Sequence, residues 1–306
     1  MIDKHLTLNK VFKGHTGSVY DLATDDEQYF YSVGGDGWIV QWDLSGGTSN
    51  GLLIAKSDSK LFSSCLLWDK NTLLTGDMYG LLYWIDIKNK EILSVVKGHQ
   101  SSIFDMYQIS DETLITASKD GYICLWDIAT KHPVYSYKIN YKGLRCIEAN
   151  MALDTIYLGG SDHNIYLFSL IQRNVIDSIT SAHENSIFTI LNLDDEALIT
   201  GGRDAHMNEW HLSNPLKRLQ SLPAHWYTIN SIVDMPSMGL IASGSRDKTI
   251  RTWDRETLQS VQVIDVQKGG HINSVNKLLW SKKFRTLISA SDDRTIRTWK
   301  TGTQND

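Results

Sequence analysis

The sequence predicts an all-β fold made of repeated four-stranded antiparallel units. The clearest unit lies between Gly98 and Asp127, where three short apolar runs alternate with polar turn residues, and a fourth apolar run follows at residues 134–138. Short β-rich runs bounded by Asp, Ser and Gly are typical of strands joined by tight turns. Two further observations support this fold class: the unit recurs along the whole chain, and its copies carry the same marker residues in the same order.

A Trp near the end of the unit sets the length of the repeat. Trp126 has six counterparts, and successive positions lie 41 to 46 residues apart: Trp42, Ile85, Phe168, Trp210, Trp253 and Trp299. A His opens five of the copies, and an Asp follows it after 21 or 22 residues in a predicted turn. Self-similarity at about 40–45 residues, with Gly-His at one end and Trp-Asp at the other, is the signature of propeller blades.

On these motifs the chain resembles the WD-repeat (WD40) β-propeller family, and the likeness covers nearly the whole sequence. The resemblance implies one domain over residues 1–306, a seven-bladed propeller of four-stranded antiparallel blades. Its repeats are expected to end near Asp43, Asp86, Asp127, Ser169, His211, Asp254 and Lys300. A single closed ring takes precedence over the two domains that a chain of 306 residues would otherwise suggest.

The two ends of the chain are expected to complete one blade together. Residues 4–12 precede the first Gly14-His15 pair and so have no blade before them. Trp299 closes the third strand of the seventh repeat, and only residues 300–306 follow it. We therefore expect residues 4–12 to form the outer strand of the last blade, because closing the ring leaves no free central edge. The family resemblance implies the same closure.

Five repeats carry a complete set of four polar markers, and two repeats are degenerate. The complete sets are His15, Ser32, Asp36 and Trp42; His99, Thr116, Asp120 and Trp126; His183, Thr200, Asp204 and Trp210; His225, Ser243, Asp247 and Trp253; and His271, Ser289, Asp293 and Trp299. In the second repeat, Asp58, Tyr79 and Ile85 stand at the His, Asp and Trp positions, while Thr75 survives. The fourth repeat keeps Asp162 but has Tyr141 near the His position, Leu158 for Ser or Thr, and Phe168 for Trp.

Ser, His and Asp in one repeat also invite a hydrolase interpretation, in which Asp orients His and His activates a hydroxyl. The family resemblance implies a structural role instead, as an internal hydrogen-bond chain from the turn Asp through His and Ser or Thr to the indole of Trp. Five copies favour that role, because an enzyme needs one site. Neither a Gly-x-Ser-x-Gly elbow nor an oxyanion motif accompanies the sets. We therefore expect no catalytic residues.

Composition and motifs narrow the function further. The net charge of −5 and the pI of about 6.0 give no global attraction to nucleic acid or acidic membranes. Neither a signal sequence nor a membrane-length apolar run is present, and the three Cys residues are expected to be buried and reduced in a cytoplasmic protein. His206 and His211 would point to opposite faces of a strand, and no metal or nucleotide-binding motif occurs. We expect neither a metal nor a cofactor.

Relatives of this kind often bind partners on the face that carries the entry to the first strand and the turn between the second and third strands. Two sets of positions are expected there. One follows the opening apolar residue of the first strand: Tyr20, Ser63, Phe104, Arg145, Phe188, Asn230 and Asn276. The other precedes the turn Asp: Gly35, Met78, Lys119, Ser161, Arg203, Arg246 and Asp292. Trp226 and Tyr227 add aromatic side chains in a loop of the same face.

Aromatic residues and Arg are enriched in binding hot spots, and here they share one predicted face. Aromatic residues are expected at the first-strand position of alternate blades, and Lys119, Arg145, Arg203 and Arg246 form a basic arc on blades three to six. The sequence thus favours a non-catalytic, monomeric scaffold for a peptide or protein partner, with a place in a larger complex. A nucleic-acid-binding propeller that uses the basic arc is one alternative, and an enzyme that uses a Ser/His/Asp cluster is another.

Overall fold

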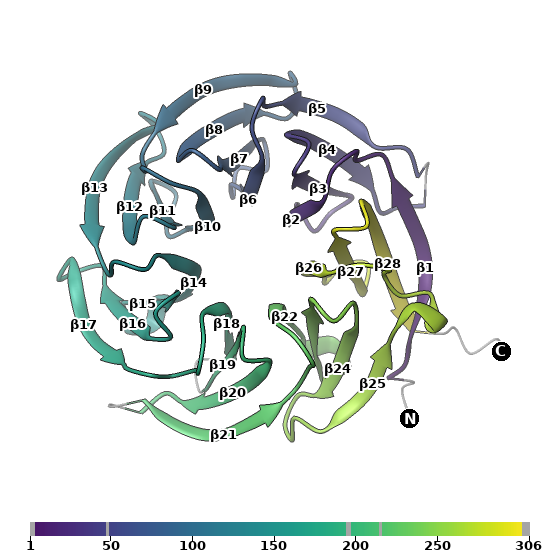
Figure 1. Ribbon diagram of the computed structural model, residues 1–306. Helices are drawn as coiled ribbons and strands as arrows, with labels where there is room; N and C mark the ends of the chain where they lie inside the picture. Colours follow the sequence, from purple (N-terminus) through teal and green to yellow (C-terminus); the bar gives the residue numbers. More distant parts are fainter. Residues whose placement is uncertain (1–3, 47–48, 194–196, 214–215, 302–306) are drawn as a thin grey trace.

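The described residues form seven four-stranded antiparallel sheets arranged around a central channel (Figure 1), which confirms the predicted all-β, seven-bladed propeller. The computed structural model describes residues 4–46, 49–193, 197–213 and 216–301. The first strand of each blade lines the channel and the fourth strand lies at the rim. Three short 3-10 turns complete the described secondary structure: η1 (Met151–Leu153), η2 (Pro236–Met238) and η3 (Val266–Lys268).

The strands run outward in chain order within blades one to six. Blade one contains β2 (Val19–Thr24), β3 (Tyr29–Gly34), β4 (Trp38–Asp43) and β5 (Leu52–Lys56), and blade two contains β6 (Leu61–Leu66), β7 (Thr72–Asp77), β8 (Leu81–Asp86) and β9 (Glu91–Lys97). Blade three contains β10 (Ile103–Gln108), β11 (Thr113–Ser118), β12 (Tyr122–Asp127) and β13 (His132–Lys138), and blade four contains β14 (Leu144–Asn150), β15 (Thr155–Gly160), β16 (Ile165–Ser169) and β17 (Asn174–Ile179). Blade five contains β18 (Ile187–Leu193), β19 (Ala197–Gly202), β20 (His206–His211) and β21 (Lys217–Pro223), and blade six contains β22 (Ile229–Met235), β23 (Leu240–Ser245), β24 (Ile250–Asp254) and β25 (Ser260–Ile264).

Blade seven joins the two ends of the chain. It contains β26 (Val275–Ser281), β27 (Thr286–Ser291) and β28 (Thr295–Thr301), and β1 (Leu6–Lys13) is its outer strand. In Figure 1 the purple β1 lies beside the yellow β28, and the register runs from Leu6 opposite Thr301 to Lys13 opposite Thr295. The ring therefore closes as the sequence predicts, through strand pairing between the first and last parts of the chain.

The hydrophobic core is divided into layers between neighbouring blades. One layer packs Leu74, Leu82 and Trp84 of blade two against Ile103 and the fully buried Trp126 of blade three. Because each blade covers both of its faces, the middle strands are almost continuously buried, as in β11 and β15. Burying one large apolar side chain stabilises the fold by roughly 1.5–3 kcal/mol, so each layer holds its two blades in a fixed orientation.

Two backbone features shape the face on which the loops enter the first strands. The residue after the turn Asp position has a positive φ in every blade, and Gly121, at φ 83°, is the blade-three example. Gly98 precedes His99 and lies against the indole of Trp126, so a Cβ built at Gly98 would come within 2.2 Å of that ring. We call this side of the propeller the turn face, and it carries the turns 35–37, 78–80, 119–121, 161–163, 203–205, 246–248 and 292–294.

Candidate functional site

The five complete marker sets come together within their own blades. In blade five, His183 Nδ1 lies 2.9 Å from Asp204, His183 Nε2 lies 2.7 Å from Thr200 Oγ1, and the indole of Trp210 donates to the same oxygen at 2.9 Å. A His that donates from Nδ1 can accept at Nε2 from the hydroxyl, so each polar side-chain group of this four-residue set has a hydrogen-bond partner within the set. The same bonds join the sets that begin at His15, His99, His225 and His271.

We call each of these four-residue sets a tetrad. The hydroxyl groups of the tetrads are not exposed to a substrate. Ser32, Thr116, Thr200, Ser243 and Ser289 all have 0% of their surface exposed. Each hydroxyl oxygen already bonds to a His ring and an indole, so its position is fixed by the blade. The geometry thus gives the hydrolase interpretation no accessible nucleophile in the tetrads. It gives each tetrad the arrangement of a strut that ties the entry loop to the turn.

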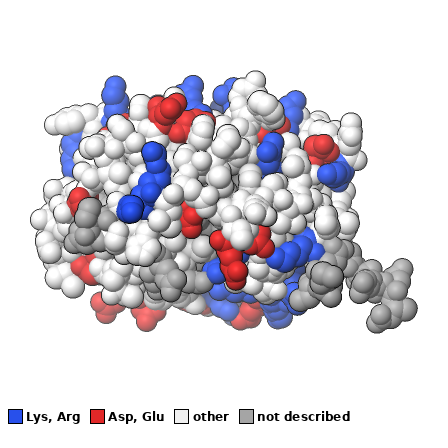
Figure 2. Space-filling model, turned by 90° about the horizontal axis from the view of Figure 1, so that it is seen from below, with Lys and Arg blue, Asp and Glu red and all other residues white. Residues whose placement is uncertain are grey.

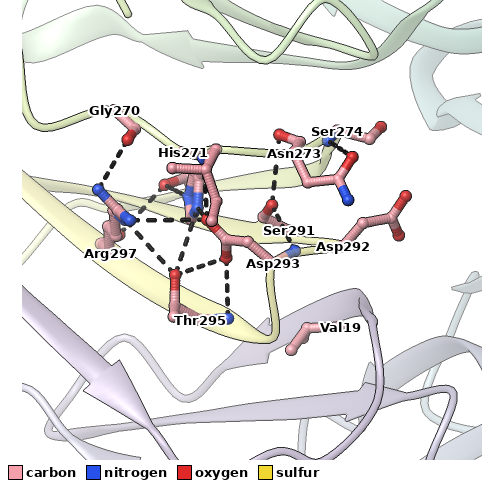
Figure 3. A network of polar contacts seen from close by, with 12 residues as sticks. Val19, Gly270, His271, Asn273, Ser274, Ser291, Asp292, Asp293, Thr295 and Arg297 are labelled. Carbon is pink, nitrogen blue, oxygen red and sulfur yellow. Dashed lines mark hydrogen bonds and ion pairs between the residues drawn. The ribbon is translucent and has the colours of Figure 1, made fainter. Parts of the chain in front are cut away.

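Figure 3 shows the end of this strut in blade seven where His271 and Asp293 meet. His271 and Asp293 lie at 2.8 Å, and Arg297 donates to the carbonyl oxygens of Gly269 and Gly270 in the entry loop. On the channel side, Asn276 Nδ2 donates to Val19 O in blade one at 2.9 Å and to Asp292 Oδ1 at 2.8 Å. Asn276 therefore fixes the channel mouth across the junction between the last blade and the first.

Blade two replaces its missing tetrad with another polar chain. Tyr79, which the sequence places at the Asp position, is an exposed turn residue, and Asp77 two residues earlier accepts from Ser59 Oγ at 2.6 Å. Ser59 bonds to Ser57, and Ser57 bonds to Tyr83 Oη at 3.0 Å. The repeat is degenerate in sequence, but the turn and the entry loop are still joined by side chains.

In blade four the sequence interpretation of the His position was wrong by one residue. Asn140 and Ile139 both donate to Gly121 O, as His99 and Gly98 do to Gly80 O one blade earlier. Asn140 is buried at 6% exposure, whereas Tyr141 is 90% exposed. The turn residue Asp162 accepts from Tyr166 Oη at 2.5 Å, but its other oxygen is buried without a partner in the described part of the chain.

A ring of first-strand residues surrounds the channel mouth. The residue that the sequence predicts for blade two of this ring was wrong. Phe62, not Ser63, follows the opening apolar residue Leu61 in blade two, because the entry loop there is one residue shorter than in the other blades. Ser63 is buried and donates to Ile103 O. The aromatic residues therefore occupy adjacent blades instead of alternate ones, and the rings of Tyr20, Phe62 and Phe104 lie 5.0 and 5.7 Å apart in succession.

Arg145 belongs to this ring and not to an exposed arc. Its guanidinium lies 4.4 Å from the ring centroid of Phe104 and 4.9 Å from that of Phe188, and its Nε donates to Ser161 Oγ at 3.0 Å. The mouth thus combines the predicted Tyr20, Phe104, Arg145, Phe188, Asn230 and Asn276 with Phe62 around a cavity of about 220 Å³. Sequence reasoning missed Phe62, which the shorter spacing between Asp58 and Leu61 could have identified.

The other predicted partner-binding residues lie exposed on the turn face. Lys119, Arg203 and Arg246 are exposed turn residues, and Trp226 and Tyr227 have exposed fractions of 81% and 60%. Gly35, Met78, Ser161 and Asp292 hold the same turn position in the remaining blades and are half-buried. The structure therefore separates the expected basic arc into one stacked guanidinium and three exposed side chains.

The protein has a net charge of −5, but the loops of the turn face carry more exposed basic than acidic residues. The exposed basic residues of its loops and turns are Lys60, Lys119, Lys142, Arg203, Arg246, Lys248, Lys268 and Arg294. Within the same described loops, the exposed acidic residues are Asp58 and Glu184. Seen from the side, Lys and Arg side chains project along one edge of the molecule with some Asp and Glu among them, and the other edge carries Asp and Glu beside further basic groups (Figure 2).

Sequence reasoning also missed a group of charged residues inside the channel. Lys277 Nζ lies 2.9 Å from Asp21 Oδ1, and Asp21 and Asp105 accept from the backbone N–H groups of Ser64 and Ile147 in the next blades. Burial raises the pKa of Asp105 to about 6. Burial, with the charge of Asp105 nearby, raises the pKa of Glu148 to about 8. No motif signals these residues, because ring closure brings them together from four different blades.

The described residues give no indication of a metal centre or a membrane helix. They contain no cluster of three or more His, Cys, Asp or Glu side chains with the spacing to hold a metal ion. None of their helical turns is long and apolar enough to cross a membrane. Cys124 and Cys146 are buried as predicted, whereas Cys65 is half-buried, and burial raises the pKa of Cys65 and Cys124 to about 12.

Comparison with known proteins gives consistent results. The family described as "WD domain, G-beta repeat" matches residues 6–43, 90–127, 216–254 and 260–300. The Denticleless protein homolog of Gallus gallus is 24% identical over 300 residues, covering 80% of this chain, and this chain spans only 42% of that protein. The Serine-threonine kinase receptor-associated protein of Mus musculus is 28% identical over 247 residues, with 79% of this chain and 68% of that protein covered.

A solved structure, the WD40 β-propeller domain of Doa1, superposes with a TM-score of 0.86 at 20% sequence identity. The match covers 97% of this chain and 98% of that domain. At this level of identity the likeness concerns the fold alone.

Proposed function

The chain belongs to the WD domain, G-beta repeat family, whose members are generally non-catalytic interaction scaffolds, and from that premise we propose that its turn face binds a protein or peptide across the channel mouth. The observation that carries the proposal is that exposed basic side chains and the aromatic residues around the channel mouth lie on the same face. Arg and aromatic residues provide most of the binding energy in typical interfaces. An acidic partner would be attracted to this face despite the negative net charge of the protein.

The polarity of the turn face also gives the ligand a preferred orientation. Lys119, Arg203 and Arg246 lie on blades three, five and six, whereas blades one, two and seven have Gly35, Met78 and Asp292 at the same turn position. We therefore expect the acidic part of the ligand to lie over blades three to six. The exposed Trp226 and Tyr227 offer apolar contact area at the same place, with few rotatable bonds to immobilise.

Charge reversal on the two faces tests this function. The doubly substituted Arg203→Glu, Arg246→Glu protein should lose partners that the parent captures from the source lysate, as identified by mass spectrometry. The matched control is Lys88→Glu, Lys90→Glu, which reverses two exposed charges in a loop on the opposite face. If the control loses the same partners and the turn-face variant keeps them, binding occurs elsewhere.

Once a partner is in hand, two single variants separate the apolar and the electrostatic contributions to binding. Phe104→Ala should weaken binding by roughly 2 kcal/mol, mainly through faster dissociation, because it removes a hot-spot ring. Arg203→Glu should slow association and weaken the dependence of the association rate on salt. Both effects can be measured by surface binding kinetics. Parent-like kinetics for both variants would place the interface on the blade sides or on the opposite face.

A nucleic-acid ligand is the second candidate, and the exposed aromatic residues beside basic ones favour it. Bases can stack on side chains such as Trp226 and Tyr227 while Lys and Arg contact phosphates. Titration with single-stranded RNA at several salt concentrations tests this candidate, because phosphate contacts make binding fall steeply with salt. Absence of salt-dependent binding would leave the protein ligand as the one candidate.

A further inference from the structure

The cavity at the channel mouth has one cationic wall, made by Arg145. Phe104 and Phe188 lie on the two sides of its guanidinium, with ring centroids at 4.4 and 4.9 Å, and Ser161 Oγ accepts from Nε at 3.0 Å. Arg145 forms no ion pair within the described residues, and its two Nη groups have no acceptor there. The guanidinium is therefore held between the two rings and by Ser161, and its Nη donors remain to bind a ligand.

Stacking between two rings makes the free edge of Arg145 a directional receptor for an anion. Burial lowers the pKa of Arg145 from its ordinary value, although arginine keeps its charge at neutral pH. A planar fork of N–H groups matches the two oxygen atoms of a carboxylate. Because the fork is already held in place, little side-chain entropy is lost when an anion binds.

Two asparagines on the other side of the cavity contribute acceptors. Asn230 Nδ2 donates to Ser274 Oγ and Val275 O, and Asn276 Nδ2 donates to Val19 O and Asp292 Oδ1. Both N–H groups of each amide are thus engaged, and neither Oδ1 has a partner within the described part of the chain, while both residues line the cavity. A ligand that carries a carboxylate and an adjacent N–H group, as a peptide residue does, would complement both walls.

The floor of the cavity limits the charge that it can accept. Lys277 is paired with Asp21 at 2.9 Å, and Asp105 adds a second carboxyl group to the lining. A dianion such as a phosphate monoester would meet these carboxylates in a poorly solvated place, whereas a single negative charge is balanced by Arg145. The volume of about 220 Å³ is also below the range of typical small-molecule pockets, so it suits one residue of a larger ligand.

We propose that this cavity, which we call the Arg145 pocket, anchors one carboxylate-bearing residue of the bound partner, with the carboxylate on the edge of Arg145 and a neighbouring N–H on the asparagine oxygens. The proposal rests on the function proposed above and adds the chemistry of the anchor residue. The carboxylate comes from an Asp or Glu side chain or from the end of a peptide chain, and the aromatic ring covers the apolar part of that residue.

Small probes test the pocket without a known partner. We would titrate four compounds: N-acetyl-aspartate N-methylamide, N-acetyl-glycine with a free carboxylate, N-acetyl-asparagine N-methylamide, and inorganic phosphate. The readout is the ¹⁵N–¹H signal of Arg145 Nε, which its bond to Ser161 keeps observable, and the Arg145→Lys variant assigns that signal by removing it. We expect a saturable shift with at least one carboxylate, and binding weaker by about tenfold for the asparagine compound.

The two carboxylate probes distinguish the source of the anchor. A stronger shift with N-acetyl-aspartate N-methylamide indicates an acidic side chain, and a stronger shift with N-acetyl-glycine indicates a chain end. Equal shifts with the aspartate and asparagine compounds, no shift with any probe, or tighter binding of phosphate than of either carboxylate would each overturn the proposal. These outcomes are read on the parent protein, so they do not depend on the folding of a variant.

Variants separate the Arg145 pocket from the wider face. Arg145→Lys retains a charge but loses the planar fork, and it should weaken binding of the carboxylate probes by about tenfold. Lys88→Gln, which removes an exposed charge in a loop of the opposite face, should leave probe binding unchanged. If the probes fail to bind but capture still depends on Arg203 and Arg246, the proposed function stands and the Arg145 pocket is not its anchor. If the probes bind and capture does not depend on those residues, the pocket stands and the exposed basic residues of the turn face do not contribute to partner binding.

Discussion

At the scale of single residues, the turn Asp shows how burial and hydrogen bonding oppose each other. Burial by itself would raise the pKa of Asp247, but hydrogen bonds from His225, Thr249 and a backbone N–H outweigh it and hold the pKa below its ordinary value. Burial lowers the pKa of His225, and Asp247 partly offsets that effect. The carboxylate therefore stabilises an imidazole that would otherwise be an unsatisfied polar group in the core.

Removing a turn Asp should therefore destabilise the protein through the His that it supports. We expect Asp120→Ala, Asp204→Ala and Asp247→Ala each to lower the free energy of unfolding by about 1–3 kcal/mol, as for an unsatisfied buried group. Chemical denaturation measures the change. Asp58→Ala is the matched control, because Asp58 is exposed on the same face and makes no tetrad. Unchanged stability in all three variants would mean that the Asp only shapes the turn and does not stabilise the buried His.

The pKa of Glu148 is raised, whereas that of Asp247 is lowered, and it predicts that the free energy of unfolding decreases as the pH rises. Its pKa is raised from 4.5 to about 8, first by burial and then by Asp105, so the folded protein keeps this proton at a pH where the unfolded chain has released it. The resulting stabilisation is complete below about pH 4.5 and is lost as the pH rises to about 8. Glu148→Gln should match the parent near the lower limit and exceed its unfolding free energy by a few kcal/mol above the upper limit.

Urea denaturation of the parent and of Glu148→Gln across this pH range would measure the effect. Glu256→Gln is the control, since Glu256 is exposed on a loop of the opposite face. A difference between Glu148→Gln and the parent that does not vary with pH would show that the Glu148 carboxyl group titrates near its ordinary pKa.

At the scale of the blade, the number of satisfied polar contacts between the turn and the entry loop differs from blade to blade. Blades three and six have complete tetrads, and blade two has a surrogate chain through Asp77 and Tyr83. In blade four, an oxygen of Asp162 has no partner among the residues that the structure describes. The four blades therefore differ in the polar contacts between the turn and the entry loop.

Amide hydrogen exchange should reveal this difference. We expect the amides of blades two and four to exchange faster than those of blades three and six, because local opening requires less free energy where fewer contacts must break. Mass spectrometry of peptic peptides after timed deuterium labelling would give rates for each blade. Slower exchange in blades two and four than in blades three and six would contradict the link between tetrads and local stability.

At the scale of the whole molecule, the ring is held closed by β1. Phe12 is 1% exposed and lies 5.3 Å from Phe30 and 5.6 Å from Trp42, ring centroid to ring centroid, so a strand of blade seven packs into blade one. Gln262 also exchanges two hydrogen bonds with the backbone of Leu6, which ties β1 to the outer strand of blade six. One strand thus connects three blades.

Loss of this strand should open the ring. Deleting residues 1–13 should lower the melting temperature and cause association, because β28 would expose an unpaired edge. Phe12→Ala is the milder test and should lower the free energy of unfolding by about 3–5 kcal/mol. Lys13→Ala, at an exposed position on the same strand, is its control. A monomeric truncated protein with an unchanged melting temperature would contradict closure by β1.

The sequence by itself determined the contacts that occur within one blade. The seven repeats, the five tetrads and the closing strand could all be predicted, because a strand-turn-strand unit places its partners at fixed separations along the chain. His183 and Asp204, for example, are 21 residues apart, and so are His99 and Asp120. Local register errors came where a loop departed from the pattern, as at Phe62 and Asn140.

Only the tertiary structure decided the contacts that occur between blades. Phe104 and Phe188 enclose Arg145 from two neighbouring blades, and Lys277 of blade seven meets Asp21 of blade one because the ring closes. The sequence placed Arg145 in an exposed basic arc, where its type and spacing fitted. It could not show the stacking, because contacts across the channel depend on the angle between blades, and that angle is set by the packing of whole apolar layers and by no single motif.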